Sequence, residues 1–311
     1  MRPVEFTSNC FPFIASPVYS TDAGTPYLKA PGVAMISRPQ VDLSGTKDFF
    51  DGFADSLGFG NYLSDPTRLH DSDQLVKFSG QICYLSHDNK RTHNKDASRY
   101  IEHIKESSHG SVLEHSQFSF LIWGIDRAVT HELVRHRHSH FSQVSQRYVD
   151  GKKLRFVERP EYQIERVSSE LRTQRLSEII LEMHTGFIAS IDSARSSYDQ
   201  RARWLTMARG AGHPMFSANY RTDARKQVNQ AARDQLPNCT EAPIVVSFNA
   251  RELRNILEQR ASGSADSTIR EMAIMLYLCV REIAPLLFSD YVPVDLPTSG
   301  TVALETPYKK I

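Results

Sequence analysis

The sequence lacks any marked excess of charge of one sign. Its 311 residues include 37 basic and 36 acidic side chains, which leaves a formal net charge of +1. Proteins dedicated to nucleic acid normally carry a basic excess that neutralises phosphates, so we expect no nucleic-acid partner. The hydrophobic content of 40% is also too high for a disordered chain. The composition therefore indicates a globular protein that can bury a sizeable core.

Long hydrophobic runs are scarce as well. The longest charge-free apolar stretch near the C-terminus, Met272 to Val280, is far shorter than the ~20 residues that span a bilayer. Residues 1–17 carry Arg2, Glu5 and prolines instead of the basic and unbroken apolar segments of a signal peptide. We therefore expect no membrane insertion, no secretion and a cytoplasmic location.

Cysteine is rare and scattered. Cys10, Cys83, Cys239 and Cys279 form no C-x-x-C pair, which argues against a zinc knuckle and against a disulfide framework. An isolated cysteine is usually a buried small hydrophobe, and none of the four has a neighbour that marks it as a nucleophile. We assign these cysteines no chemistry.

The chain divides into three predicted regions. Residues 1–70 are rich in Pro, Gly, Ser and Asp without a long periodic run, which predicts an irregular N-terminal extension. Residues 71–292 contain the periodic segments and form the predicted catalytic domain. Residues 293–311 are predicted to be a C-terminal tail.

Within the predicted catalytic domain, the periodicity indicates both strands and helices. Alternation predicts a strand over 115–123, and a β-branched run predicts another over 243–248. Asp126 is expected to cap the first helix after the strand. Apolar residues at helical spacing predict helices over 97–105, 126–134, 164–205, 223–235, 250–261 and 267–288.

Histidine and arginine gather in one part of the chain. Seven of the 12 histidines lie between residues 103 and 140, and Arg135, Arg137 and Arg147 lie among or just after them. Neighbouring guanidinium groups repel one another unless anions hold them, and arginine binds phosphate through a planar two-pronged contact. For any single histidine, a solvated surface position is the alternative. Together, the cluster predicts a phosphorylated ligand.

The same segment contains a pattern that zinc could bind. His136, His138 and His140 would lie on one side of an extended chain, as zinc ligands do. Arg135 and Arg137 would then lie close to the cation, and no nearby Asp, Glu or Cys is placed to complete the ligand set. We predict no metal, and a metal-dependent hydrolase stays open as an alternative.

The predicted helix over 250–261 carries two distinct faces. Its apolar stripe ends in a charged residue: Leu253, Ile256, Leu257 and Arg260. A second face offers hydrogen-bonding groups four residues apart: Arg251, Asn255 and Gln259. A half-buried guanidinium group at the end of the stripe needs a partner, whereas one that reaches solvent at the helix end does not.

Several segments resemble one enzyme family. Arg135-His136-Arg137, followed after seven residues by Ser145-Gln146-Arg147, resembles the R-H-R-x7-S-x-R signature of the flavin-dependent thymidylate synthases, the ThyX family. SSHGSVLEHSQFSF ahead of this motif, and QAARDQLPNCTE and FNARELRNILEQRAS after it, are similar to further segments of that family. The resemblance runs from about Gln74 to Tyr291, with residues 1–70 and the stretch around 195–222 as additions.

The resemblance implies a fold and an activity. The fold is α+β, with a mixed sheet and long helices, in a homotetramer whose active sites lie where subunits meet. The implied reaction is the reductive methylation of dUMP to dTMP. The one-carbon unit comes from 5,10-methylenetetrahydrofolate and the electrons come from NADPH through FAD, the cofactor that carries the redox chemistry.

The resemblance also assigns residues to these ligands. The residues implied to contact FAD are His109, Ser111, Arg135, His136, Arg137, Gln143, Asn249, Arg251 and Asn255. The residues implied to hold dUMP are Glu132, Arg135, Gln143, Ser145, Arg147, Arg233 and Arg260. Arg260 is implied to be catalytic, because a cation against the uracil ring favours the deprotonated pyrimidine and makes its carbon 5 nucleophilic.

Two positions depart from the family pattern. Ser264 stands where family members often have histidine, which affects a flavin or folate contact. Gln143 stands where some members have glutamate, which removes a charge but keeps a hydrogen-bonding group. A binding module for RNA or nucleotides that uses the same arginines stays open as a second alternative.

Overall fold

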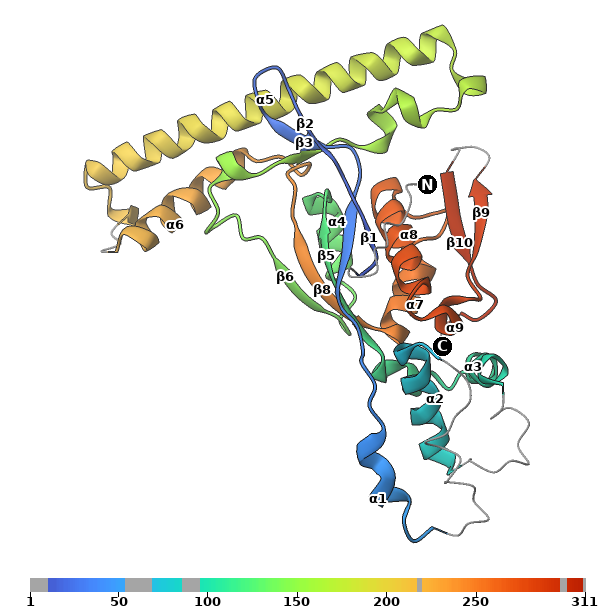
Figure 1. Ribbon diagram of the computed structural model, residues 1–311. Coiled ribbons are helices and arrows are strands. Elements are labelled where there is room, and N and C mark those ends of the chain that lie inside the picture. The colour runs from blue at the N-terminus through green and yellow to red at the C-terminus, as the bar shows by residue number, and fades with distance from the viewer. Residues whose placement is uncertain (1–10, 54–68, 86–95, 217–219, 297–300, 310–311) are drawn as a thin grey trace.

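A five-stranded antiparallel sheet forms the centre of the molecule (Figure 1). The computed structural model describes residues 11–53, 69–85, 96–216, 220–296 and 301–309. The strands follow the order β1 (Phe13–Ile14), β4 (Gly32–Ser37), β5 (Gln117–Trp123), β8 (Ile244–Asn249) and β6 (His140–Gln143). Gln117 pairs with Asn249, so the segment before β5 and the segment after β8 meet at the same end of these two central strands.

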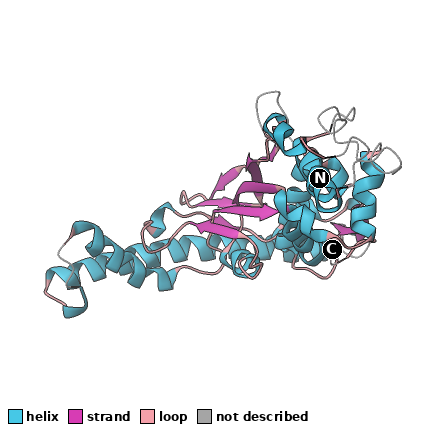
Figure 2. Ribbon diagram, turned by 90° about the horizontal axis from the view of Figure 1, so that it is seen from below, coloured by secondary structure: helices cyan, strands magenta, loops and turns pink. Residues whose placement is uncertain are grey.

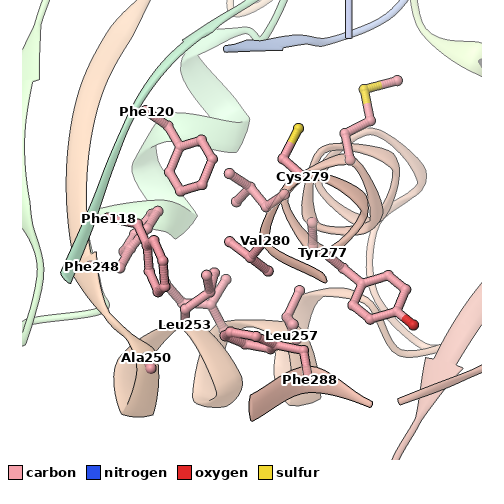
Figure 3. Packing of buried hydrophobic residues seen from close by; sticks show 14 of the residues in the cluster. Phe118, Phe120, Phe248, Ala250, Leu253, Leu257, Tyr277, Cys279, Val280 and Phe288 are labelled. Carbon is pink, nitrogen blue, oxygen red and sulfur yellow. The ribbon is translucent and has the colours of Figure 1, made fainter. Parts of the chain in front are cut away.

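One face of the sheet is buried under helices. In β5, Phe118, Phe120 and Ile122 are buried, and the residues between them are more exposed, as expected of a strand covered on one face. The covering helices are α7 (Ala250–Arg260), α8 (Ser267–Arg281) and α9 (Pro285–Phe288). Figure 3 shows side chains that fill the space between sheet and helices: Phe118, Phe120, Phe248, Leu253, Leu257, Val280 and Phe288.

The remaining helices surround this core. They are α1 (Lys47–Phe50), α2 (Asp71–Tyr84), α3 (Ala97–Glu106), α4 (Arg127–Leu133), α5 (Gln174–Gly210) and α6 (Arg221–Ala232). Helix α6 packs against α5, and in Figures 1 and 2 α6 and the C-terminal end of α5 project beyond the sheet. Short 3-10 helices connect these elements: η1 (Ser44–Thr46), η5 (Gly110–His115), η6 (Gly151–Lys153), η7 (Pro160–Tyr162), η8 (Ile164–Arg166), η9 (Ser169–Leu171), η10 (Pro214–Phe216) and η11 (Arg233–Gln235).

Two smaller sheets complete the fold. β2 (Val18–Ser20), β3 (Pro26–Leu28) and β7 (Phe156–Val157) form a three-stranded sheet in which β3 and β7 are parallel. β9 (Val292–Leu296) and β10 (Thr301–Glu305) form an antiparallel hairpin. The α+β class is therefore confirmed. The mixed pairing lies in the three-stranded sheet, since the central sheet is antiparallel.

Most predicted elements of residues 71–292 are confirmed. Asp126 caps α4, because its Oδ1 accepts a hydrogen bond from the backbone N–H of Val129 at 2.9 Å. The helix predicted from residue 164 begins only at Gln174, because residues 164–171 form 3-10 turns. The helix predicted over 267–288 is interrupted, and Pro285, which lacks a backbone N–H, begins a new helix there.

The predicted irregular N-terminal extension is wrong for part of its described residues. β1 and β4 belong to the central sheet, and Ile14, Val33 and Met35 are buried in the core. These strands are short and are separated by Pro and Gly residues, so their sequence shows no visible period. Their burial results from pairing, with Val33 of β4 opposite Ile122 of β5. Residues 1–10 and 54–68 lie outside the described residues.

The predicted C-terminal tail also has regular structure. Leu304 of β10 is buried, and its backbone N–H donates to the carbonyl oxygen of Ala261 at 2.9 Å. Ala261 directly follows α7, so the hairpin is attached to the end of that helix. The tail prediction is wrong for β9 and β10, because cross-strand pairing and this contact order a segment that is too short to show periodicity.

In the described part of the chain, no helix combines the length and the apolar character needed to cross a membrane. Cys279 is buried, Cys239 is partly buried and Cys83 is exposed, each as a free thiol. The expectation of burial is therefore wrong for Cys83. Cys10 lies outside the described residues.

Candidate active site

Helix α4 and the turn after it position the arginine-histidine motif. The backbone N–H groups of Arg135 and His136 donate to the carbonyl oxygens of Glu132 and Leu133, at 3.2 and 3.1 Å. This turn directs His136 inward, where it is 4% exposed. Arg135 and Arg137 are both exposed. The histidine therefore belongs to the interior, and the two guanidinium groups are free to meet a ligand.

Arg260, the last residue of α7, contacts side chains of α4 and of the turn after it. Its Nη1 donates to Oε2 of Glu132 at 2.6 Å, and its Nε donates to Nε2 of His136 at 3.2 Å. The expected partner of a half-buried guanidinium group is thus a pair of side chains from the α4 segment. Helix α4 follows β5 and helix α7 follows β8, and because these strands are antiparallel the two helices begin at opposite ends of the strand pair. The contacts of Arg260 join the C-terminal end of α7 to the C-terminal part of α4 and the turn after it.

Glu252 contacts the other side of His136. Its Oε1 lies 3.3 Å from Nδ1 of His136, and both side chains are almost fully buried. Burial, together with the nearby cation of Arg260, lowers the pKa of His136 to about 4, and burial raises the pKa of Glu252. His136 is therefore neutral at neutral pH.

A cavity of about 350 Å³ lies next to Glu252. It is lined by Glu114, His138, Asn249, Arg251, Glu252, Arg254, Asn255, Glu258, Tyr291 and Tyr308. Three of these residues, Asn249, Arg251 and Asn255, were assigned to FAD by resemblance. Asn249 caps α7 through a 2.8 Å hydrogen bond from the N–H of Glu252, and Arg251 Nη1 donates to Glu114 at 2.6 Å.

The 3-10 helix η5 packs against α7. It carries Ser111, and His109 immediately precedes it. Both residues are exposed. Because η5 leads into β5, the strand pairing brings these two predicted residues to the same end of the strands as Asn249.

A second group of predicted residues lies around β6 and α6. The Nε of Arg147 donates to Oε1 of Gln230 at 3.3 Å, and Ser145 Oγ accepts from the backbone N–H of Arg147 at 3.3 Å. Arg233 begins η11 and is exposed. Gln143, at the end of β6, has a buried Nε2 without a hydrogen-bond partner among the described residues. This group offers donors to an anion or to a carbonyl oxygen.

Two residues near the site were missed by reasoning from the sequence. Glu252 precedes Arg260 by eight residues, so the two lie on the same side of α7, and this spacing could have identified Glu252 as a partner of the site. Tyr308 lines the cavity but comes from the C-terminal segment, where the sequence carries no comparable signal.

The histidine pattern is not arranged as a metal site. No three or more His, Cys, Asp or Glu side chains within the described ranges are grouped so that they could hold a metal ion. His136 contacts Glu252 and Arg260 with its two ring nitrogens, whereas His138 and His140 are exposed.

Solved structures share this fold. The chain is similar to a UMP/dUMP methylase, PolB from Streptomyces cacaoi, bound with 5-Br dUMP, at a TM-score of 0.56 and 16% sequence identity. The match covers 84% of this chain and 94% of that chain. The structure of PolB bound with 5-Br UMP matches with a TM-score of 0.55 and 15% identity, over 84% of this chain and 93% of the other. At these identities the likeness concerns the fold alone.

Sequence comparisons identify the family. Residues 64–286 match the family model described as thymidylate synthase complementing protein, Thy1. The chain is 36% identical over 245 residues to a flavin-dependent thymidylate synthase of Mycobacterium leprae, covering 79% of this chain and 89% of the relative. It is 39% identical over 237 residues to that of Mycobacterium marinum, covering 76% and 86%. The chain therefore belongs to the Thy1 family and is a methyltransferase enzyme of the flavin-dependent thymidylate synthase type.

Proposed function

We propose that this protein makes dTMP by reductive methylation of dUMP, with 5,10-methylenetetrahydrofolate as the one-carbon donor and NADPH as the source of electrons through FAD. The observation that carries the proposal is the fixed guanidinium group of Arg260, held by Glu132 at 2.6 Å and by His136 at 3.2 Å. A cation held in one orientation stabilises negative charge that develops on a bound uracil ring. Arg260 is the proposed catalytic residue.

The second group of predicted residues binds the nucleotide in this proposal. Arg147 and Arg233 hold the phosphate of dUMP, because guanidinium groups match its oxygens. Arg135 contributes a third exposed cation. Ser145 and the free amide donor of Gln143 hydrogen-bond polar atoms of the nucleotide. Glu132, already bonded to Arg260, keeps that cation in place beside the base.

The residues around the cavity fit a bound FAD. The cavity has the volume of a small-molecule site, and Asn249, Arg251 and Asn255 offer amide and guanidinium groups suited to hydroxyl, carbonyl and diphosphate groups. His109, Ser111, His136, Arg137, Arg135 and Gln143 complete the proposed set. When bound, FAD supplies hydride transfer, which an amino-acid side chain cannot perform.

A homotetramer is part of the proposal. Large apolar side chains are exposed along α5 and in the segment after it: Ile179, Leu181, Trp204, Met207 and Met215. Exposed apolar surface of this kind favours association between protein chains. In the proposed assembly, neighbouring subunits cover this surface and complete each active site.

Three measurements on the purified protein test the proposal. FAD titration should produce flavin absorbance with quenched fluorescence, and dTMP formation should require dUMP, methylenetetrahydrofolate and NADPH.

Arg260→Ala should lower the rate of dTMP formation about 100-fold, which corresponds to a loss of about 3 kcal/mol of transition-state stabilisation, while FAD binding persists. Arg260→Lys should recover little, because an ammonium group lacks the planar fork of donors. Methylation at the wild-type rate by Arg260→Ala would remove Arg260 from the mechanism.

A further inference from the structure

Four side chains form an unbroken line of contacts from α7 to α4. Glu252 lies 3.3 Å from Nδ1 of His136, Nε2 of His136 accepts from Nε of Arg260 at 3.2 Å, and Arg260 reaches Glu132 at 2.6 Å. Glu252 and His136 are the buried half of the line, and Arg260 and Glu132 are the more exposed half. The line therefore connects a buried carboxylate to the proposed catalytic guanidinium group.

The hydrogen-bond partners determine which nitrogen of His136 carries the proton. Nε of Arg260 is always a donor, so Nε2 of His136 must be the acceptor and must be unprotonated. The single proton of the neutral ring then lies on Nδ1, which faces the carboxylate of Glu252 at 3.3 Å, and the negative charge of that carboxylate favours an N–H at this nitrogen. Both a protonated ring and the opposite tautomer would place an N–H group against the N–H group of Arg260.

We propose that Glu252 is a positioning residue for the methylation reaction, which holds His136 in the tautomer that accepts a hydrogen bond from Arg260 and so fixes the orientation of that guanidinium group. The proposal rests on the proposed function, in which Arg260 acts on the uracil ring.

The burial of Glu252 supports this role. Its side chain is only 6% exposed, and a carboxylate removed from water is costly unless it is hydrogen-bonded. Its Oε1 faces His136, and its Oε2 accepts from Nδ2 of Asn255 at 3.4 Å. Both oxygens are thus used to orient neighbouring side chains of the site.

Loss of Glu252 would leave Arg260 with one anchor. Glu132 is 41% exposed on its side chain, so it restricts the long arginine side chain less firmly than a buried partner does. Without a carboxylate at Nδ1, the opposite tautomer of His136 becomes accessible and removes the acceptor at Nε2. Misplacement of a catalytic group by about 1 Å costs on the order of 100-fold in rate.

The central experiment compares Glu252→Ala and Glu252→Gln, each in the wild-type and in the Arg260→Ala background. We expect Glu252→Ala to lower kcat for dTMP formation on the order of 10-fold to 100-fold, with little change in KM for dUMP. Glu252→Gln should stay within about threefold of wild type, because its carbonyl oxygen still presents an acceptor to Nδ1. In the Arg260→Ala background, Glu252→Ala should have no additional effect on kcat, because Glu252 acts through Arg260.

The outcomes separate this proposal from the proposed function. If the wild-type protein forms no dTMP, the proposed function fails. If Arg260→Ala retains the wild-type rate, dTMP formation stands, but the catalytic role of Arg260 fails and the positioning role of Glu252, which acts through Arg260, fails with it. If Arg260→Ala is slow and Glu252→Ala slows it further by the same factor as in the wild type, only the positioning role of Glu252 is overturned. A Gln variant that is as slow as the Ala variant also overturns it.

A matched control and a direct measurement complete the test. Glu158→Ala breaks another buried glutamate–histidine pair, with His184, in a different part of the chain, and should lower thermal stability while kcat stays within about twofold. An equal loss of kcat in this control would contradict a specific role for Glu252.

If Glu252→Ala does not fold, nitrogen-15 NMR of histidine-labelled wild-type protein determines which ring nitrogen of His136 carries the proton. We expect the proton on Nδ1, and a proton on Nε2 at neutral pH would overturn the proposal.

Discussion

Arg254 and Arg260 lie on the same helix and have opposite surroundings. Arg254 is buried and pairs with both oxygens of Asp290, at 2.8 and 2.7 Å, and this pairing helps to lower the pKa of Asp290 to about 2 even though burial alone would raise it. Lys105 also contacts Asp290, at 2.9 Å. Arg260, by contrast, has one partially exposed carboxylate partner. We therefore assign Arg254 to stability and Arg260 to chemistry.

The two arginines should respond differently to removal. Arg254→Ala leaves Asp290 buried without its bidentate partner, and we expect a loss of about 3 to 5 kcal/mol in the free energy of unfolding. Arg260→Ala should cost about 1 kcal/mol or less, because its ion pair is open to solvent. Urea unfolding of both variants measures the difference. Equal destabilisation would contradict the division of roles.

The buried neutral state of His136 predicts a pH dependence of stability. Its pKa is about 4 in the folded protein and 6.5 when unfolded, so its contribution is fully present above pH 6.5 and is lost as the pH falls toward 4. Arg260 and Glu252 are the charged groups that face its two ring nitrogens. Relative to His136→Gln, the wild-type protein should lose up to about 3 kcal/mol of unfolding free energy between pH 7 and pH 4. Thermal or urea unfolding at several pH values checks this, and parallel curves for the two proteins would contradict it.

At the scale of elements, the C-terminal segment becomes one wall of the cavity. Arg254 Nη2 donates to the carbonyl oxygen of Tyr308 at 3.3 Å, and Lys105 Nζ lies 5.5 Å from the centre of the Tyr308 ring. Thr306 donates to Asp290, so the Arg254–Asp290 pair holds this segment as well as α7. The segment lies beyond residues 64–286, which match the family model.

Tyr308 should therefore contribute to cofactor binding. Its ring lines the cavity assigned to FAD, and aromatic contacts are worth about 1 kcal/mol. Tyr308→Ala should weaken FAD binding about fivefold, as measured by fluorescence quenching. Lys309→Ala, at an exposed neighbouring position, is the control and should bind FAD like the wild type. An unchanged dissociation constant for Tyr308→Ala would exclude the ring from the cofactor site.

At the scale of the whole molecule, the prediction concerns assembly. The proposed sites need more than one chain, and the exposed apolar residues of α5, such as Leu181 and Met207, offer a surface for association. Multi-angle light scattering should give about four times the 35.3 kDa mass of one chain. Dilution should reduce FAD binding and mass together. A monomer with full activity would contradict the tetramer and leave the residue assignments in place.

The sequence alone determined the features that depend on local pattern and on motif. Helical periodicity identified α7 and α8, alternation identified β5, and the Arg135 to Arg147 motif identified the family before any contact was known. Local patterns are informative because a repeating apolar face reports burial within one element. The sequence also placed Arg260 at the end of an apolar stripe, and it left open whether the guanidinium group pairs there or reaches solvent at the helix end.

Only the tertiary structure decided which residues meet. β1 and β4 are too short to show a period, and they join the central sheet because β4 pairs with β5 and β1 pairs with β4. The partners of Arg260 lie in α4 and in the turn after it, far away in sequence, and only the contact with His136 connects Glu252 to them. Tyr308 reaches the cavity because Asp290 and Arg254 anchor the chain end. Contacts between distant segments depend on the packing of the whole chain, so no local pattern in the sequence records them.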